Sequence, residues 1–258
     1  MADVHDLQAA PVAVDGRAAA PVDLHREPPA TPWAFFSGRR YALAVVGLLF
    51  VALAASAATE NGWLLLRWDR PIQQFVEDHR TAFLTTFFLF VSRFGSTMVV
   101  LGLGALFTVL CWQRCRAVSY AIIVATLSRP LLEATVKEIV GRDRPAYDRL
   151  VDGTGYSFPT GHVMAAVALW GLLPVIVGLF TKSRALWWAS VVVSGVMIVA
   201  IGASRVYLGV HWFSDVIAGL LVGTFFLLAI EQVLAHAHRT DHCARGGCGT
   251  RTDCADAT

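Results

Sequence analysis

Charged residues are scarce in this sequence. Asp, Glu, Lys and Arg make up 16% of the 258 residues, whereas hydrophobic residues make up 56% and the mean hydropathy is +0.57. This balance argues against an ordinary soluble domain and is typical of a membrane protein. The formal net charge is only +2, which decides nothing about partners. We expect the protein to interact with the membrane bilayer and not with nucleic acid.

No segment before residue 41 resembles a signal peptide. Residues 1–32 are rich in Ala, Pro and charge, so we expect residues 1–36 to form a disordered N-terminal arm. Residues 237–258 contain His and Cys, but their spacing matches no standard zinc finger. We therefore predict a disordered C-terminal tail without metal, and a single membrane domain over residues 37–236.

Long apolar runs are present throughout that domain. A bilayer core of about 30 Å needs roughly 20 helical residues, and six runs come close to this length: 41–58, 96–112, 117–136, 163–181, 185–203 and 212–235. We predict an all-α fold, a bundle of six transmembrane helices.

The apolar stretch 79–96 is interrupted by Arg93 and Gly95. We interpret it as an amphipathic helix in the membrane interface. The alternative is a seventh span, which would place the termini on opposite sides of the membrane.

The short connections indicate an orientation. Basic residues occur in 37–40, 112–116, 181–184 and 236–240, which the positive-inside rule places in the cytoplasm. The opposite loops also contain arginines, so the bias is modest. All five cysteines fall on the predicted inner side, where thiols are kept from an oxidising exterior. We expect a multi-pass plasma-membrane protein with both termini cytoplasmic.

Polar residues gather at the predicted outer face. In the segment "SRVYLGVHWFSD", Asp215 follows His211 by four residues, so in a helix it could accept a hydrogen bond from one ring nitrogen and fix the tautomer. The other ring nitrogen would then be nucleophilic. Arg205, in the preceding loop, offers a fork of donors suited to phosphate oxygens.

Two further polar segments lie on the same predicted face. "KEIVGRDRP" contributes Lys137 and Arg144, and "FPTGH" places His162 at the start of a span. A helix N-terminus presents unpaired backbone N–H groups and a partial positive charge, which favour an anion. Together these cations and histidines predict a site for a phosphate ester.

The same segments resemble the three sequence blocks of the type 2 phosphatidic acid phosphatase family, relatives of bacterial acid phosphatases and vanadium haloperoxidases. Lys137, six residues, then Arg144 and Pro145 resembles the first block. "PTGH" at 159–162 is similar to the second, with Thr160 where serine is usual. Ser204, Arg205, five residues, His211, three residues and Asp215 resembles the third.

This resemblance implies an outward-facing phosphatase site without metal or other cofactor. It implies that His211 attacks phosphorus to form a phosphohistidine, that Asp215 orients it, and that His162 protonates the leaving oxygen and then activates water. The phosphoryl oxygens would be held by Lys137, Arg144, Thr160, Gly161 and Arg205. Such preplaced donors suit a transition state with charge on three equatorial oxygens.

Several alternatives stay open. The expected substrate is a lipid phosphate or diphosphate, because a soluble ester would not require six spans. A phosphotransferase could use the same intermediate, and a transporter could use charges at one membrane end as a gate. The particular lipid and the oligomeric state are not given by the sequence.

Charges also occur inside the predicted third span. Arg129, Glu133 and Lys137 are spaced four apart and share one helical face. They form either a self-neutralising buried pair, or a ladder in which Glu133 also holds Lys137 for the phosphate. Both readings require Glu133 to face the bundle interior. Gly219 and Gly223 predict close helix packing.

Overall fold

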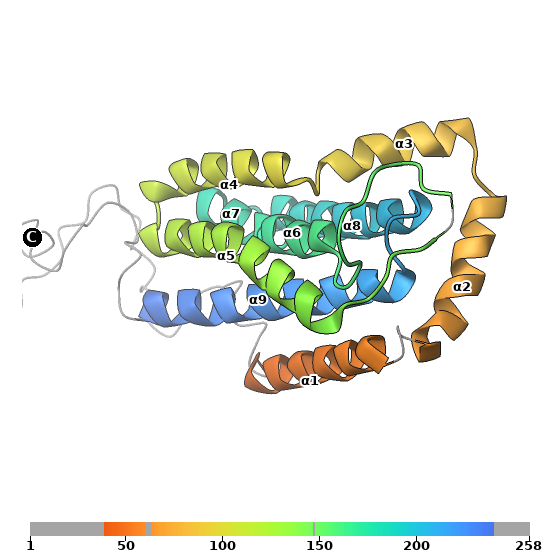
Figure 1. Cartoon of the computed structure of the whole chain (residues 1–258). Coiled ribbons are helices and arrows are strands. Elements are labelled where there is room, and N and C mark those ends of the chain that lie inside the picture. The colour runs from red at the N-terminus through yellow and green to blue at the C-terminus, as the bar shows by residue number, and fades with distance from the viewer. Residues whose placement is uncertain (1–38, 60–62, 147, 240–258) are drawn as a thin grey trace, which may run out of the picture. The chain divides into compact units, whose positions relative to one another are not determined.

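A computed structural model describes residues 39–59, 63–146 and 148–239, and within these ranges every regular element is a helix. The all-α prediction is confirmed. The expected arm 1–36 lies outside the described residues, as does most of the expected tail. The helices are α1 (Arg39–Ala58), α2 (Trp63–Asp78), α3 (Ala82–Arg93), α4 (Thr97–Trp112), α5 (Arg116–Val140), α6 (Gly161–Trp170), α7 (Leu173–Phe180), α8 (Arg184–Tyr207) and α9 (Phe213–Arg239) (Figure 1).

Four helical segments are long and apolar enough to cross a bilayer on their own. The first is α5, the second is formed by α6 and α7 together, the third is α8, and the fourth is α9 as far as Ile230. Many large apolar side chains on the outer helices face outward, among them Leu127, Leu131 and Val199, each more than 60% exposed. Apolar side chains exposed over several helices mark a surface that lipid covers. The protein is therefore a multi-pass membrane protein.

Two bent helix pairs decide whether the number of spans reaches six. α1 and α2 meet at 90°, α3 and α4 meet at 46°, and each pair is a candidate span when its two helices are counted together. The described residues thus give four to six spans, and six is the upper end of this range. The interfacial placement of residues 79–96, which include α3, stays a prediction.

The amphipathic helix α2 was not expected from the apolar runs. It contains Pro71, buries Asp69 and Gln73 against the bundle, and exposes Trp68 and Phe75. It runs across one end of the bundle, where it contacts α8 and α9 (orange, Figure 1). This helix brings a buried carboxylate to that end of the molecule.

The centre of the bundle is α6, which packs most extensively on α9. The predicted close packing is confirmed, since a Cβ at Gly219 would lie 2.8 Å from the carbonyl oxygen of Thr160, and one at Gly223 would lie 2.6 Å from Val167 Cβ. Only glycine permits this approach. The contact sets the start of α6 directly against the start of α9.

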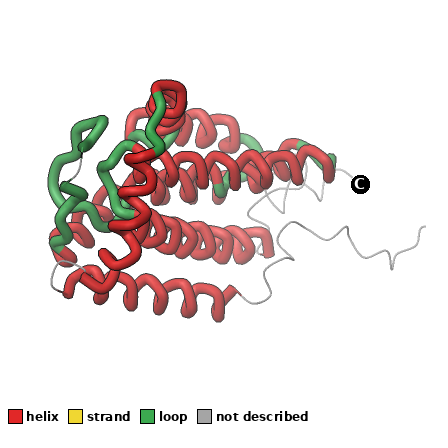
Figure 2. The backbone as a smooth tube through the Cα atoms, turned by 90° about the vertical axis from the view of Figure 1, so that its right-hand side faces the viewer, coloured by secondary structure: helices red, strands yellow, loops and turns green. Residues whose placement is uncertain are grey.

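All the segments singled out by motif meet at one end of the bundle. The C-terminal ends of α5 and α8, the N-terminal ends of α6 and α9, and the loop 141–160 lie together there (Figures 1 and 2). The α4–α5 and α7–α8 connections lie at the opposite end. The loop begins at Gly141, whose φ of 62° ends α5 in a left-handed cap.

Candidate active site

His211 lies in the tight turn between α8 and α9 and is buried, with 3% of its surface exposed. Its Nδ1 lies 2.8 Å from the carbonyl oxygen of Ser157, which can only accept, so Nδ1 carries the hydrogen. Its Nε2 lies 3.3 Å from Nη1 of Arg144, which can only donate. Both neighbours select the same tautomer, and Nε2 is left with its lone pair.

Arg144 is held rigidly beside that lone pair. Its guanidinium donates to three backbone carbonyl oxygens, those of Thr154 (2.8 Å), Gly155 (2.9 Å) and Val210 (2.7 Å). Two of these belong to the loop 141–160 and the third precedes His211. A fixed cation is therefore placed next to the unprotonated ring nitrogen of His211.

Asp215 is placed differently from the sequence-based expectation. Because α9 begins at Phe213, His211 lies outside the helix, and its Nδ1 is 3.6 Å from Asp215 Oδ2, beyond a hydrogen bond. The prediction that Asp215 fixes the tautomer directly is thus corrected, because the carbonyl of Ser157 does so. Asp215 instead accepts from the backbone N–H of Trp212 at 2.9 Å and from Arg142 at 2.6 Å.

The second block forms the start of α6. Thr160 is fully buried and is the N-cap residue, yet its hydroxyl neither caps the helix nor has a hydrogen-bond partner among the described residues. A buried hydroxyl of this kind normally finds a partner. Gly161 follows in the first turn, and a Cβ there would overlap the carboxylate of Glu133. The cradle at this helix terminus therefore requires glycine.

The carboxylate of Glu133 joins two cations of α5. It lies 2.7 Å from Arg129 Nη1 and 2.7 Å from Lys137 Nζ, and Arg129 also donates to the carbonyl oxygen of Gly161 at 3.2 Å. The prediction that Glu133 reaches these cations on the inner side of the helix is confirmed. Lys137 is thereby held at the start of α6.

Arg205 lies in the last turn of α8, and not in a loop as the sequence suggested. It is 7% exposed, and its Nη1 donates to Ser92 Oγ of α3 at 2.7 Å, while its Nε has no partner among the described residues. The neighbouring Ser204 makes only a local bond to the carbonyl oxygen of Ile201. Arg205 keeps donor capacity that a phosphate could use.

These groups converge on one small volume. The charged groups that act on His162 are Arg205, His211, Arg129 and Lys137. Those that act on Arg205 include Arg144 and Glu133. The structure therefore brings together the residues that the sequence selected from α5, α6, α8 and α9, from the loop 141–160 and from the turn that holds His211, with Asp215 3.6 Å from His211.

Burial alters the protonation of the nucleophile. Desolvation lowers the pKa of His211 to about 4, helped by the cations Arg205 and Arg144 and opposed by Asp215. The imidazole is consequently neutral and nucleophilic across the physiological range.

Asp143, Asp148 and Asp152 of the loop 141–160 are exposed, as is usual for polar residues of a solvated turn. Among the residues that the structure describes, no group of three or more His, Cys, Asp or Glu side chains is arranged to hold a metal ion.

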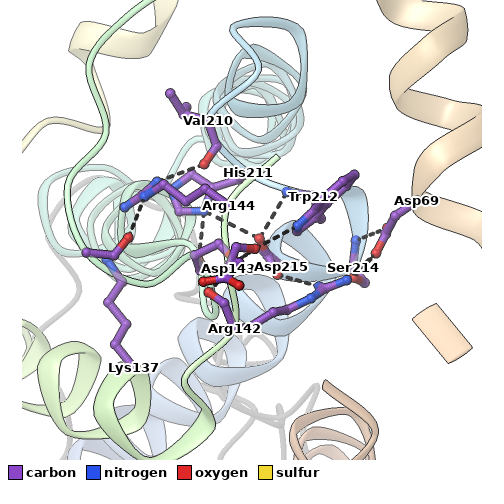
Figure 3. A network of polar contacts seen from close by, with 12 residues as sticks. Asp69, Lys137, Arg142, Asp143, Arg144, Val210, His211, Trp212, Ser214 and Asp215 are labelled. Atoms are coloured by element: carbon purple, nitrogen blue, oxygen red, sulfur yellow. Dashed lines mark hydrogen bonds and ion pairs between the residues drawn. The ribbon is translucent and has the colours of Figure 1, made fainter. Parts of the chain in front are cut away.

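Four contributing residues were not found from the sequence. Ser157 orients His211, and Ser92 holds Arg205. Arg142 and Asp69 hold Asp215 and the start of its helix (Figure 3). Arg142 lies within the first block, but no sequence pattern indicates that its side chain is buried, with only 1% exposed. Asp69 belongs to α2, which the apolar runs did not reveal.

Comparison with known proteins agrees with this geometry. Residues 116–239 match the PAP2 superfamily, and the family resemblance of the three blocks is confirmed. The match extends from the start of α5 to the end of α9 and contains all eight site residues that the sequence selected.

Two relatives have curated names. Phosphatidylglycerophosphatase B of Bacillus subtilis (strain 168) is 30% identical over 137 residues, which are 51% of this chain and 64% of the relative. The chain thus spans slightly less than two thirds of that protein. Undecaprenyl-diphosphatase of Sulfolobus acidocaldarius is 25% identical over 201 residues, 76% of this chain and 92% of the relative.

Two solved structures have a similar fold. The crystal structure of a transmembrane PAP2-type phosphatidylglycerolphosphate phosphatase from Bacillus subtilis gives a TM-score of 0.66 at 26% identity, covering 80% of this chain and all of that one. LpxE of Aquifex aeolicus gives a TM-score of 0.51 at 20% identity, covering 64% and 95%, and this likeness concerns the fold alone.

Proposed function

We propose that the protein is an integral-membrane phosphatase that hydrolyses a lipid phosphate or diphosphate through a phosphohistidine intermediate. One observation carries the proposal: a buried histidine with its Nε2 lone pair available lies against the fixed guanidinium of Arg144. Around it, the site provides further cations and a second histidine. The names of the relatives support a lipid substrate.

The reaction would proceed in two displacements at phosphorus. In the first, Nε2 of His211 bonds to phosphorus, the bond from phosphorus to the lipid oxygen breaks, and His162 gives its proton to that oxygen. In the second, His162 takes a proton from water, the hydroxide bonds to phosphorus, and the bond to Nε2 breaks. The products are inorganic phosphate and the lipid alcohol, or inorganic phosphate and the lipid monophosphate when the substrate is a diphosphate and the leaving oxygen is the one that bridges the two phosphates.

Charge stabilisation would come from groups already in place. Arg144 and Arg205 are fixed by carbonyl and hydroxyl acceptors, Lys137 by Glu133, and the Thr160 hydroxyl is unpartnered. Preorganised donors lower the barrier because they need no reorganisation as charge develops. Asp215 would stabilise the positive ring of the phosphohistidine from 3.6 Å.

We also propose that the site opens on the outer face of the plasma membrane. The basic connections between α4 and α5 and between α7 and α8 lie at the end of the bundle opposite the site, which supports this orientation.

The function is tested by phosphate release from purified protein in detergent with excess EDTA. Phosphatidylglycerol phosphate, undecaprenyl diphosphate and phosphatidic acid form the substrate panel. We expect release from at least one lipid without added metal, and none from His211→Ala. Turnover that appears only after magnesium is added, or that survives His211→Ala, would contradict the proposal.

A further inference from the structure

Asp69 of α2 is a buried carboxylate that the reaction scheme above does not use. It is 1% exposed, although α2 is an amphipathic helix at the surface of the bundle. Its Oδ1 accepts from the backbone N–H of Ser214 at 2.9 Å, and its Oδ2 accepts from the Ser214 hydroxyl at 2.5 Å and from Arg142 Nη2 at 2.7 Å (Figure 3). These contacts join the carboxylate to Ser214 at the start of α9 and to Arg142 in the loop 141–160.

Arg142 links Asp69 to Asp215. Its Nη1 lies 2.6 Å from Asp215 Oδ1 and 2.6 Å from the Ser214 hydroxyl oxygen, and its guanidinium lies 5.7 Å from the ring of Trp212. Both carboxylates and the guanidinium are almost completely buried. The three charges form one unit, which we call the carboxylate–guanidinium relay (Asp69, Arg142 and Asp215).

The relay carries one net negative charge beside the nucleophile. Without Asp69, the charge of Asp215 would be matched by Arg142 alone. With Asp69, Arg142 is shared between two carboxylates, so it neutralises the negative charge of Asp215 only in part. Asp215 Oδ2, which lies 3.6 Å from Nδ1 of His211, therefore retains negative charge beside the ring. That charge is needed when the ring of His211 becomes positive on forming its bond to phosphorus.

A purely structural role explains this unit poorly. Buried ion pairs add little net stability compared with apolar side chains of similar volume, because both partners must be desolvated. A buried network is informative where it fixes a geometry that catalysis needs. Here it ends at the residues that directly follow His211.

We propose that Asp69 is a positioning residue of the phosphatase site, acting through Arg142 and Ser214 on Asp215 and thereby on His211. The proposal rests on the proposed function, and it extends the site beyond residues 116–239 to a helix that the matched domain does not include. Asp69 itself touches no substrate.

The test replaces Asp69 with asparagine, which keeps the size and the acceptor for the Ser214 N–H but removes the charge. Asp78→Asn is the matched control, since Asp78 is an exposed carboxylate on the same helix. We expect Asp69→Asn to lower kcat roughly 10- to 100-fold, the range seen when groups that orient a functional ligand are changed. KM should change less than about 3-fold, because the phosphate donors are untouched. Asp78→Asn should leave both constants unchanged.

A wild-type kcat in folded Asp69→Asn protein would overturn the proposal, as would an equal loss in both variants. Should Asp69→Asn fail to fold, Ser214→Ala takes its place, because it removes only the hydroxyl that joins Asp69 and Arg142. A loss of roughly 3- to 10-fold in kcat at constant KM is then expected, about the value of one hydrogen bond. Unchanged kcat in folded Ser214→Ala would overturn the proposal.

Ligand binding separates this proposal from the proposed function. Orthovanadate can adopt the five-coordinate geometry of phosphoryl transfer, whereas inorganic phosphate resembles the product. Asp69→Asn should weaken orthovanadate binding at least about 10-fold and leave phosphate binding within about 2-fold. Absence of lipid hydrolysis by the wild-type protein would refute the proposed function only. Equal orthovanadate binding by wild type and Asp69→Asn would refute the positioning role.

Discussion

Glu133→Gln perturbs the two ion pairs that hold Lys137 at the candidate site. The carboxylate accepts from Arg129 and Lys137 at 2.7 Å each, and the three side chains are 7 to 19% exposed. Glutamine keeps one acceptor oxygen but leaves two neighbouring cations without a counter-charge. A surface ion pair contributes ~0–1 kcal/mol to stability, and breaking a buried ion pair costs ~3–5 kcal/mol. Because these side chains are partly buried, we expect Glu133→Gln to lower the free energy of unfolding by about 1–3 kcal/mol.

The effect on activity separates the two roles of Glu133. If it positions Lys137 for the phosphate, Glu133→Gln should lower kcat/KM roughly 10- to 100-fold, because a mobile ammonium must be ordered in each turnover. The assay is phosphate release in EDTA beside the thermal midpoint of the same preparation. Glu138→Gln, an exposed residue of the same helix, is the control and should change neither. A folded Glu133→Gln protein with lowered midpoint and wild-type kcat/KM would leave Glu133 with a structural role only.

Three other predictions concern protonation, packing and topology. Because the pKa of His211 is lowered to about 4, kcat/KM should fall only below about pH 4 on the acid side, where the ring is protonated; an acid limb near pH 6.5 would contradict this. Gly223→Ala forces a Cβ against Val167 and should cost about 1–3 kcal/mol of stability, measured by thermal unfolding. Gly195→Ala, where the space is open, should be neutral or stabilising, and equal midpoints would refute the packing argument. A cysteine at Thr154 should react with an impermeant thiol reagent from outside intact cells, while a reporter after residue 240 should be cytoplasmic; the reverse pattern would overturn the topology.

The fold class and the grouping of the candidate site residues could be predicted from the sequence because both depend on local signals. Apolar runs of nearly 20 residues report helices in a bilayer directly. His162 and His211 stand in blocks whose order along the chain is a strong signature. The ladder of Arg129, Glu133 and Lys137 was visible because its spacing of four places all three on one helical face.

The hydrogen-bond and ion-pair partners of these groups could not be predicted from the sequence, because they come from segments that are distant along the chain. The orientation of His211 is set by the carbonyl of Ser157, 54 residues away in sequence, which no side-chain pattern reports. Asp215 was assigned that role on the assumption that the helix includes His211, but α9 starts two residues later. Asp69 lies on a helix too amphipathic to appear as an apolar run, and only tertiary packing reveals its contact with Arg142.

The proposed reaction requires a covalent bond between phosphorus and His211. To detect this bond, the wild-type protein is mixed with a lipid substrate labelled in its terminal phosphate, and the reaction is quenched rapidly without acid. Peptide mapping then locates the label. The account predicts a label that is stable to alkali, labile to acid and confined to the peptide containing His211, and that is absent from His211→Ala. A label on another residue, or steady phosphate release by His211→Ala, would contradict it.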